Sequence, residues 1–238
     1  DFAMGAMENV GAVTFRENLL LFDKDKATRS ELDRSITVIA HELAHMWFGD
    51  LVTMKWWDGI WLNEAFASLM EVIASYNTYP EFKQWNAMNM SRTAGFSIDS
   101  LENSRPVEFD VETPDQAEEM FDVLTYEKGS TVLRMFQMFI GEEAFQNGVE
   151  AYLNKFKFEN TNSSDLWDAL SEASNQPLNK ILPFWIREKG YPFLQVDCSN
   201  NFLTIKQKPF LLKNVETDKN NIKPVPVHIK FLDTGNEE

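Results

Sequence analysis

The chain has 238 residues, 44% of them hydrophobic and seven of them tryptophan, enough to form one large domain, or one domain and part of a second. Its formal net charge of −15 argues against nucleic acid and anionic membranes as partners. A single cysteine, Cys198, excludes an internal disulfide and favours a reducing compartment such as the cytoplasm. No apolar run approaches the roughly 20 residues of a membrane span, so we expect no membrane contact from this segment.

The first part of the chain predicts one strand and two helices. Residues Gly11 to Phe15 include several β-formers and predict a strand. A capping box formed by Ser30 and Asp33 predicts the start of a helix, in which apolar residues recur every three or four positions and which stops at Gly49. A second helix is predicted from about Leu62 to Tyr76.

Helical periodicity continues through the middle of the chain. Further helices are predicted at residues 82–91, 118–140, 142–158, 164–174 and 178–189. An irregular, acidic and proline-containing segment at residues 99–114 separates the first two of these.

The hydrophobic period changes to two beyond Gly190. Strands are predicted at residues 193–198, 202–207 and 225–232, with a turn at 199–201 joining the first two. His228 falls on the last strand among apolar residues, which favours a structural role over metal binding. We therefore expect a domain boundary near Gly190, with a mainly helical domain at residues 1–190 and a second domain beginning at 191.

The strongest functional signal is the run His41-Glu42-Leu43-Ala44-His45, followed nineteen positions later by Glu64. Histidines four residues apart project from one face of a helix, and Glu64 on the second helix can return a carboxylate to them. Two imidazoles, one carboxylate and an open fourth position are typical of a catalytic rather than a structural zinc site. Glu42 is close enough to act on a water beside the metal without binding the metal itself. The alternative is a helix with two incidental histidines.

A second motif, Met4-Gly5-Ala6-Met7-Glu8-Asn9, precedes the first. Alone it would indicate no more than a strand end with a solvated glutamate. Together with His-Glu-Leu-Ala-His, the segment Trp-Leu-Asn-Glu-Ala-Phe-Ala and the later Leu-Thr-Tyr-Glu-Lys-Gly, it closely resembles the aminopeptidase N family of zinc exopeptidases. The resemblance extends to about Gly190.

The resemblance implies a role for each matching residue. One Zn²⁺ per chain would be bound by His41, His45 and Glu64, with Glu42 as the general base. Glu8 would bind the free α-amine of a peptide, and Tyr126 would stabilise the oxyanion. Met4, Gly5 and Ala6 would contact the substrate, with Met4 lining the first side-chain pocket. A further candidate, Ser68, lies one helical turn after Glu64 and could support a metal ligand.

The resemblance also implies a fold. We expect an α+β protein in which a thermolysin-like, mainly helical catalytic domain at residues 1–190 has a β edge at its N-terminus. Residues 191–238 would be the first strands of a β-sandwich. The family's upstream β-domain and further downstream domains would be missing partners of this segment, so we expect the segment alone to work poorly or not at all.

Three alternatives remain beside a zinc aminopeptidase acting on peptides with a free N-terminus. A leukotriene-hydrolase-like bifunctional enzyme typically has glycine where this chain has Ala6 and Ala65. A thermolysin-like endopeptidase would not need an amine anchor such as Glu8. A catalytically inactive peptide-binding module would not need Glu42. The preferred N-terminal residue and the oligomeric state are not encoded in these motifs.

Overall fold

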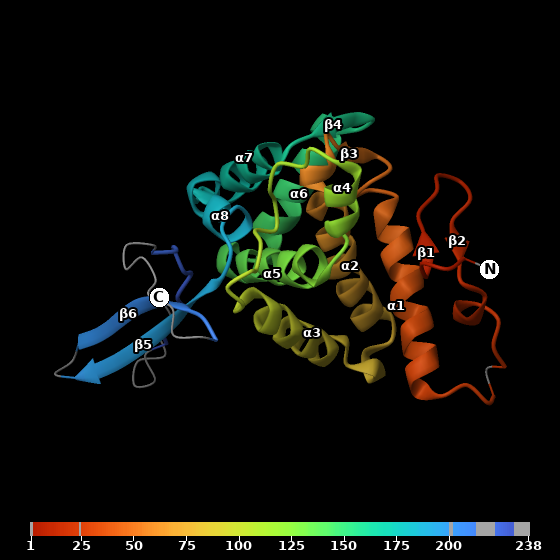
Figure 1. The fold of residues 1–238 in the computed structure, drawn as a ribbon, viewed down its shortest axis with the longest axis horizontal. Coiled ribbons are helices and arrows are strands. Elements are labelled where there is room, and N and C mark those ends of the chain that lie inside the picture. The colour runs from red at the N-terminus through yellow and green to blue at the C-terminus, as the bar shows by residue number, and fades with distance from the viewer. Residues whose placement is uncertain (1, 24, 200–201, 213–221, 231–238) are drawn as a thin grey trace.

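The computed structural model describes residues 2–23, 25–199, 202–212 and 222–230. Helices form most of it, and each of the three small sheets contains two strands, which agrees with the expected α+β class (Figure 1). The α-helices are α1 (Arg29–His45), α2 (Trp61–Thr78), α3 (Gln84–Asp99), α4 (Pro114–Glu119), α5 (Gly129–Ile140), α6 (Glu142–Phe156), α7 (Ser163–Ser174) and α8 (Leu178–Ile186). None of the helices in these described residues combines the length and apolarity needed to cross a membrane.

The N-terminal edge is a short antiparallel pair, β1 (Ala6–Met7) and β2 (Thr14–Phe15), which lies beside α1 (Figure 1). The expected strand at Gly11–Phe15 is therefore shorter than predicted. Gly11 has a φ of 76°, a left-handed conformation typical of a turn rather than of a strand.

Helix α1 begins two residues earlier than its predicted cap would place it. Thr28, not Ser30, is the N-cap: its hydroxyl accepts the backbone N–H of Glu31, and the Glu31 carboxylate accepts the backbone N–H of Thr28 at 2.7 Å. The helix also ends earlier, at His45 rather than at Gly49. A turn at residues 46–51 follows, in which the Gly49 N–H donates to the Val52 carbonyl at 2.9 Å.

Helix α2 forms the centre of the core. Trp61, Ala65, Phe66 and Leu69 of this helix are fully buried, and the Phe66 ring stacks on Phe48 with 4.4 Å between ring centroids. A predicted helix at 62–76 thus extends over residues 61–78. Its burial on several sides places Glu64, in the first turn, deep inside the molecule.

The long helix predicted at residues 118–140 is not continuous. Pro114 follows the N-cap Thr113 and starts the short α4 early, and a π-helical turn (Leu124–Lys128) precedes α5. Between them, the Asp122 carboxylate accepts the backbone N–H groups of Leu124 and Thr125 at 2.8 and 3.1 Å. A new helical segment is therefore capped at Asp122, and it carries Tyr126.

Helix α5 packs very closely against α2. An added Cβ at Gly129 would lie 2.7 Å from the Cβ of Ala65, so only glycine fits at this crossing. This contact fixes the distance between the helix that carries Glu64 and the turn that carries Tyr126.

The remaining helices agree with prediction apart from their ends. The helix expected at 82–91 continues to Asp99, and those expected at 142–158, 164–174 and 178–189 span Glu142–Phe156, Ser163–Ser174 and Leu178–Ile186. A parallel pair, β3 (Val52–Met54) and β4 (Glu159–Thr161), was not predicted. Strand β4 has only three polar residues, too few to show a period of two.

Beyond α8 the chain forms an antiparallel hairpin, β5 (Tyr191–Ser199) and β6 (Phe202–Phe210), which extends away from the helical body (Figure 1). The turn predicted at 199–201 includes residues 200–201, which lie outside the described residues. The strand predicted at 225–232 is wrong for residues 225–229, which form no strand; Lys230 is a single bridge residue, and residues 231–232 lie outside the described residues. His228 is accordingly exposed and not part of a strand. Lys223, shortly before these residues, instead donates to the Phe184 and Glu188 carbonyls at 2.6 and 3.1 Å.

Candidate metal centre

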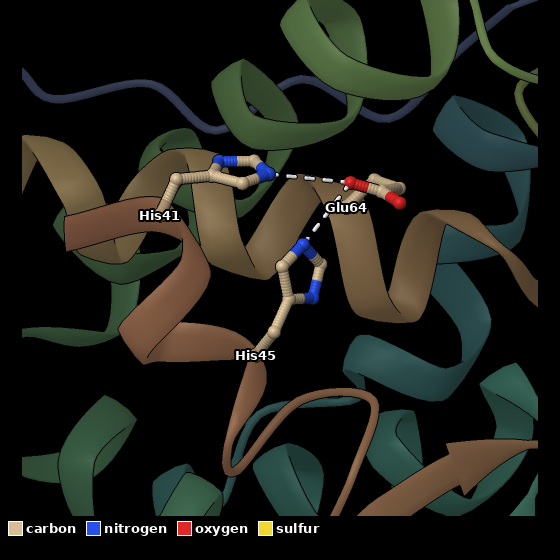
Figure 2. A group of neighbouring side chains, drawn as sticks. All are labelled: His41, His45 and Glu64. Atoms are coloured by element: carbon tan, nitrogen blue, oxygen red, sulfur yellow. Dashed lines mark hydrogen bonds and ion pairs between the residues drawn. The ribbon is translucent and has the colours of Figure 1, made fainter. Parts of the chain in front are cut away.

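Helices α1 and α2 bring His41, His45 and Glu64 together (Figure 2). The Nε2 atoms of both imidazoles lie 3.3 Å from the same atom, Oε2 of Glu64. The possible ligand atoms all lie within 4.8 Å of one another, and in the described part of the chain no other group of histidine, cysteine or acidic side chains does so. The predicted spacing therefore brings all three side chains to one point.

Each imidazole is also held at its outer nitrogen. His41 Nδ1 lies 2.8 Å from Glu71 Oε2, and His45 Nδ1 lies 2.9 Å from the Phe48 carbonyl oxygen. A carboxylate and a carbonyl can only accept, so both Nδ1 atoms donate. Both Nε2 atoms are thereby directed to the common point at Glu64.

The three side chains are strongly coupled through their charges. Burial alone would lower the pKa of His41, but its bonds to Glu64 and Glu71 outweigh burial and raise this pKa to about 10. The same balance at His45, dominated by Glu64, also raises its pKa. Burial would raise the pKa of Glu64, yet the two imidazoles lower it to about 2. Without a metal, the proton on His41 supplies positive charge beside Glu64 at neutral pH.

This arrangement fits a Zn²⁺ ion. Two imidazole nitrogens and one carboxylate oxygen are the donor set of a catalytic zinc site, and their outer nitrogens are already hydrogen-bonded as such ligands require. Oε2 of the neighbouring Glu42 is buried and has no hydrogen-bond partner among the described residues, so a polar group is needed beside it.

Glu42 follows His41 on α1 and is 5% exposed. Burial raises the pKa of its carboxyl to about 7, against the opposing effect of His41 and His45. A carboxylate with a pKa near neutrality can both take up and release a proton at physiological pH.

Tyr126, in the π-helical turn, lies beside His41. The two rings stack with 6.1 Å between centroids and 17° between planes. Burial, the charge of Glu64 and a hydrogen bond to Glu64 raise the pKa of the phenol well above its usual value. The hydroxyl is therefore a proton-bearing donor throughout the neutral range.

Glu8 follows β1, and its charge influences the same group of side chains. Its negative charge contributes to raising the pKa of Glu42, His45 and Tyr126. Nearby, Gly5 has a φ of 106° and its carbonyl accepts the Arg16 N–H at 2.5 Å. Ala6 pairs with Phe15. The Met4 side chain is 82% exposed, and its place in a substrate pocket stays a prediction.

Glu71, which was not predicted, rather than Ser68 supports a candidate ligand. In the described part of the chain the hydrogen bonds to the two Nδ1 atoms come from Glu71 and Phe48, and Ser68 makes none with them. A usable signal was present, since Glu71 follows Glu64 by seven residues, two helical turns, and so lies on the same face. The crossing of α1 and α2 decides that Glu71, and not Ser68, reaches the His41 imidazole.

Comparison with known proteins identifies the family. The profile of the peptidase family M1 domain matches residues 1–185. The chain belongs to peptidase family M1. This is the aminopeptidase N family of zinc metallopeptidases, as the motifs predicted.

Similar proteins occur in distant organisms. The chain is 40% identical to Aminopeptidase M1-A of Oryza sativa over 100% of its own length and 28% of that protein. It is 42% identical to the Puromycin-sensitive aminopeptidase of Caenorhabditis elegans, over 96% of the chain and 25% of the relative. It is 45% identical to Probable aminopeptidase 1 of Sulfurisphaera tokodaii, over 90% and 27% respectively. The chain thus spans little more than a quarter of the length of these relatives.

Proposed function

We propose that the protein is a zinc-dependent aminopeptidase that hydrolyses the N-terminal peptide bond of peptides. The observation that supports this most directly is the convergence of His41, His45 and Glu64 beside a buried glutamate, Glu42, whose carboxyl pKa is raised to about 7. His41, His45 and Glu64 hold one Zn²⁺, which when bound polarises the scissile carbonyl and makes water acidic enough to attack near neutral pH.

Glu42 carries out the proton transfers. Its carboxylate accepts a proton from the attacking water and passes it to the amine that leaves. Its pKa of about 7, raised by burial, suits both transfers at neutral pH. Tyr126, protonated because of its raised pKa, donates a hydrogen bond to the oxygen of the scissile carbonyl as negative charge develops on it.

Substrate recognition falls to the N-terminal edge. Glu8 binds the α-ammonium group of the peptide by a charge-assisted hydrogen bond. Gly5 and Ala6, small residues, let the backbone of this edge approach the substrate, and Met4 contributes to the wall of the first side-chain pocket.

We also propose a division of the chain into two domains. Residues 1–190 form a thermolysin-like catalytic domain, and the β5–β6 hairpin begins a β-sandwich domain at residue 191. The change from a helical to a two-residue period at Gly190 supports this division.

The test is hydrolysis of fluorogenic aminoacyl amides by the full-length protein, with and without a chelator. We expect cleavage that the chelator abolishes and added Zn²⁺ restores, and no cleavage of the N-acetylated substrates. Cleavage of free and acetylated substrates at equal rates would contradict the aminopeptidase assignment. Activity that survives complete zinc removal would contradict the metal assignment.

A further inference from the structure

Helix α2 presents two carboxylates to one imidazole. Glu64 and Glu71 are seven residues apart on this helix, so they lie two turns apart on the same face. His41 from α1 lies between them, with Nε2 at 3.3 Å from Glu64 Oε2 and Nδ1 at 2.8 Å from Glu71 Oε2. One nitrogen faces the candidate metal position, and the opposite nitrogen is held by Glu71.

His45 is held in a different way. Its Nδ1 donates to the Phe48 backbone carbonyl, and the Phe48 ring stacks on the buried Phe66. Gly49, with a φ of 139°, continues the turn, and an added Cβ there would lie 3.4 Å from His45 Nδ1. The orientation of His45 is therefore set by the backbone, whereas that of His41 depends on one side chain.

Glu71 also borders a second polar space, on the side away from the three ligands. A cavity of about 280 Å³ is lined by Glu71 together with Ser68, Ser91, Glu127 and Ser130, among others. The Glu71 side chain is 25% exposed, compared with 13% for His41. The Glu71 carboxylate thus borders this polar space while its Oε2 accepts the hydrogen of His41 Nδ1.

We propose that Glu71 is the positioning residue of this metal centre: by accepting the Nδ1 hydrogen of His41 it fixes the tautomer and ring orientation in which Nε2 binds zinc. The proposal rests on the zinc-binding function proposed above. Glu71 is not one of the three candidate ligands, and its hydrogen bond to His41 is the contact through which it would act on the metal.

The consequence is a graded loss of zinc affinity. Without an acceptor at residue 71, the His41 ring can rotate and exchange tautomers, so binding must first reorder it. Loss of such an outer hydrogen bond typically weakens metal binding about 10- to 100-fold. The neutral amide of glutamine still accepts one hydrogen bond, so we expect Glu71→Gln to weaken binding less than about 10-fold.

The experiment measures the zinc dissociation constant of the full-length protein by chelator competition. The decisive pair is Glu71→Gln and Glu71→Met, which are similar in size but differ in the acceptor. We expect Glu71→Met to bind zinc about 10- to 100-fold more weakly than the parent, and Glu71→Gln to lie between the two. The cobalt-substituted protein should show an altered visible spectrum in Glu71→Met and a nearly unaltered one in Glu71→Gln.

Two control variants isolate the hydrogen bond. Ser68→Ala removes a hydroxyl from the same helix and cavity, and Glu127→Gln removes a carboxylate from the same cavity; the described structure shows no hydrogen bond from either residue to His41. Both should keep the zinc affinity within about twofold of the parent. Melting temperatures of the zinc-free variants show whether each has folded, and Glu71→Ala replaces Glu71→Met if the latter has not.

The outcomes separate this inference from the proposed function. Equal zinc affinity in the parent and Glu71→Met, alongside loss of zinc in Glu64→Ala, would overturn the role of Glu71 and leave the metal site intact. Equal losses in Glu71→Met, Glu71→Gln and Glu127→Gln would also overturn it, because general charge rather than a hydrogen bond would be responsible. Unchanged zinc binding in Glu64→Ala would instead reject the proposed metal site.

Discussion

The rings of His41 and Tyr126 lie nearly parallel, with 17° between their planes and 6.1 Å between their centroids. Tyr126 is also hydrogen-bonded to Glu64, so its hydroxyl reaches the group of side chains that would bind zinc. The π-helical turn and the close packing of Gly129 on Ala65 hold the phenol there. A proton donor and the imidazole of a candidate metal ligand thus lie side by side.

Tyr126→Phe should reduce kcat about 100- to 1000-fold, the usual cost of losing one oxyanion donor. Zinc content and KM should change little, because the phenol is not a ligand and acts on developing charge. Steady-state kinetics beside metal analysis provides the check. A rise in KM at constant kcat would show that Tyr126 serves binding rather than the chemical step.

Glu42→Gln should keep zinc but lose about 100- to 10,000-fold in kcat, because an amide cannot accept the proton. Glu64→Ala is the control that should lose both zinc and activity. Metal content is measured on both variants after dialysis against the same buffer. Loss of zinc from Glu42→Gln would contradict the assignment of Glu42 as a general base that does not bind the metal.

Glu8→Ala should raise KM and lower kcat, since a charge-assisted hydrogen bond to the α-ammonium both binds and aligns the peptide. We expect kcat/KM to fall roughly 10- to 150-fold, which corresponds to a loss of about 1.5–3 kcal/mol of transition-state stabilisation. The variant and the parent are compared on the same aminoacyl amide at equal zinc occupancy. Unchanged kinetics in Glu8→Ala would remove Glu8 from substrate recognition.

Zinc binding should release protons. In the zinc-free protein the pKa of His41 is raised to about 10, so at pH 7.5 its imidazole carries a proton that zinc must displace. The apparent zinc affinity should therefore rise with pH, by about tenfold per unit for each proton released, up to a pH near this pKa. Calorimetry in two buffers of different ionisation enthalpy counts the protons, and we expect at least one. A count of zero would contradict a protonated His41.

Gly129→Ala should destabilise the fold by about 1–3 kcal/mol, because the new methyl group would lie 2.7 Å from the Ala65 Cβ. Gly95→Ala, in α3, is the matched control: its Cβ would meet no atom closer than 3.6 Å, so the higher helix propensity of alanine should leave stability equal or increased. Chemical denaturation of the zinc-free proteins measures both. Equal stabilities of the two variants would show that α5 can move away from α2 at little cost.

The two histidines of the candidate metal site could be placed together from the sequence because their spacing is a property of a single helix. Residues four apart share a helical face whatever surrounds the helix, and this places His41 and His45 together. The start of a helix is harder to predict from the sequence. Thr28 and Ser30 are both suitable N-cap residues, and the reciprocal hydrogen bonds with Glu31 select Thr28. The break after α4 was not predicted, because it depends on Asp122, whose carboxylate caps the next turn and binds Arg105 at 2.5 Å, seventeen residues away.

Contacts between side chains of different helices depend on the tertiary structure. The sequence determined a helix with two histidines and a glutamate on a following helix, since helical periodicity is local. It did not determine that Glu71, rather than Ser68, reaches His41, or that Tyr126 stacks beside it, because both depend on how α2 packs against α1 and α5. That packing is set by close contacts such as Gly129 on Ala65 and Phe48 on Phe66, between residues far apart in the chain.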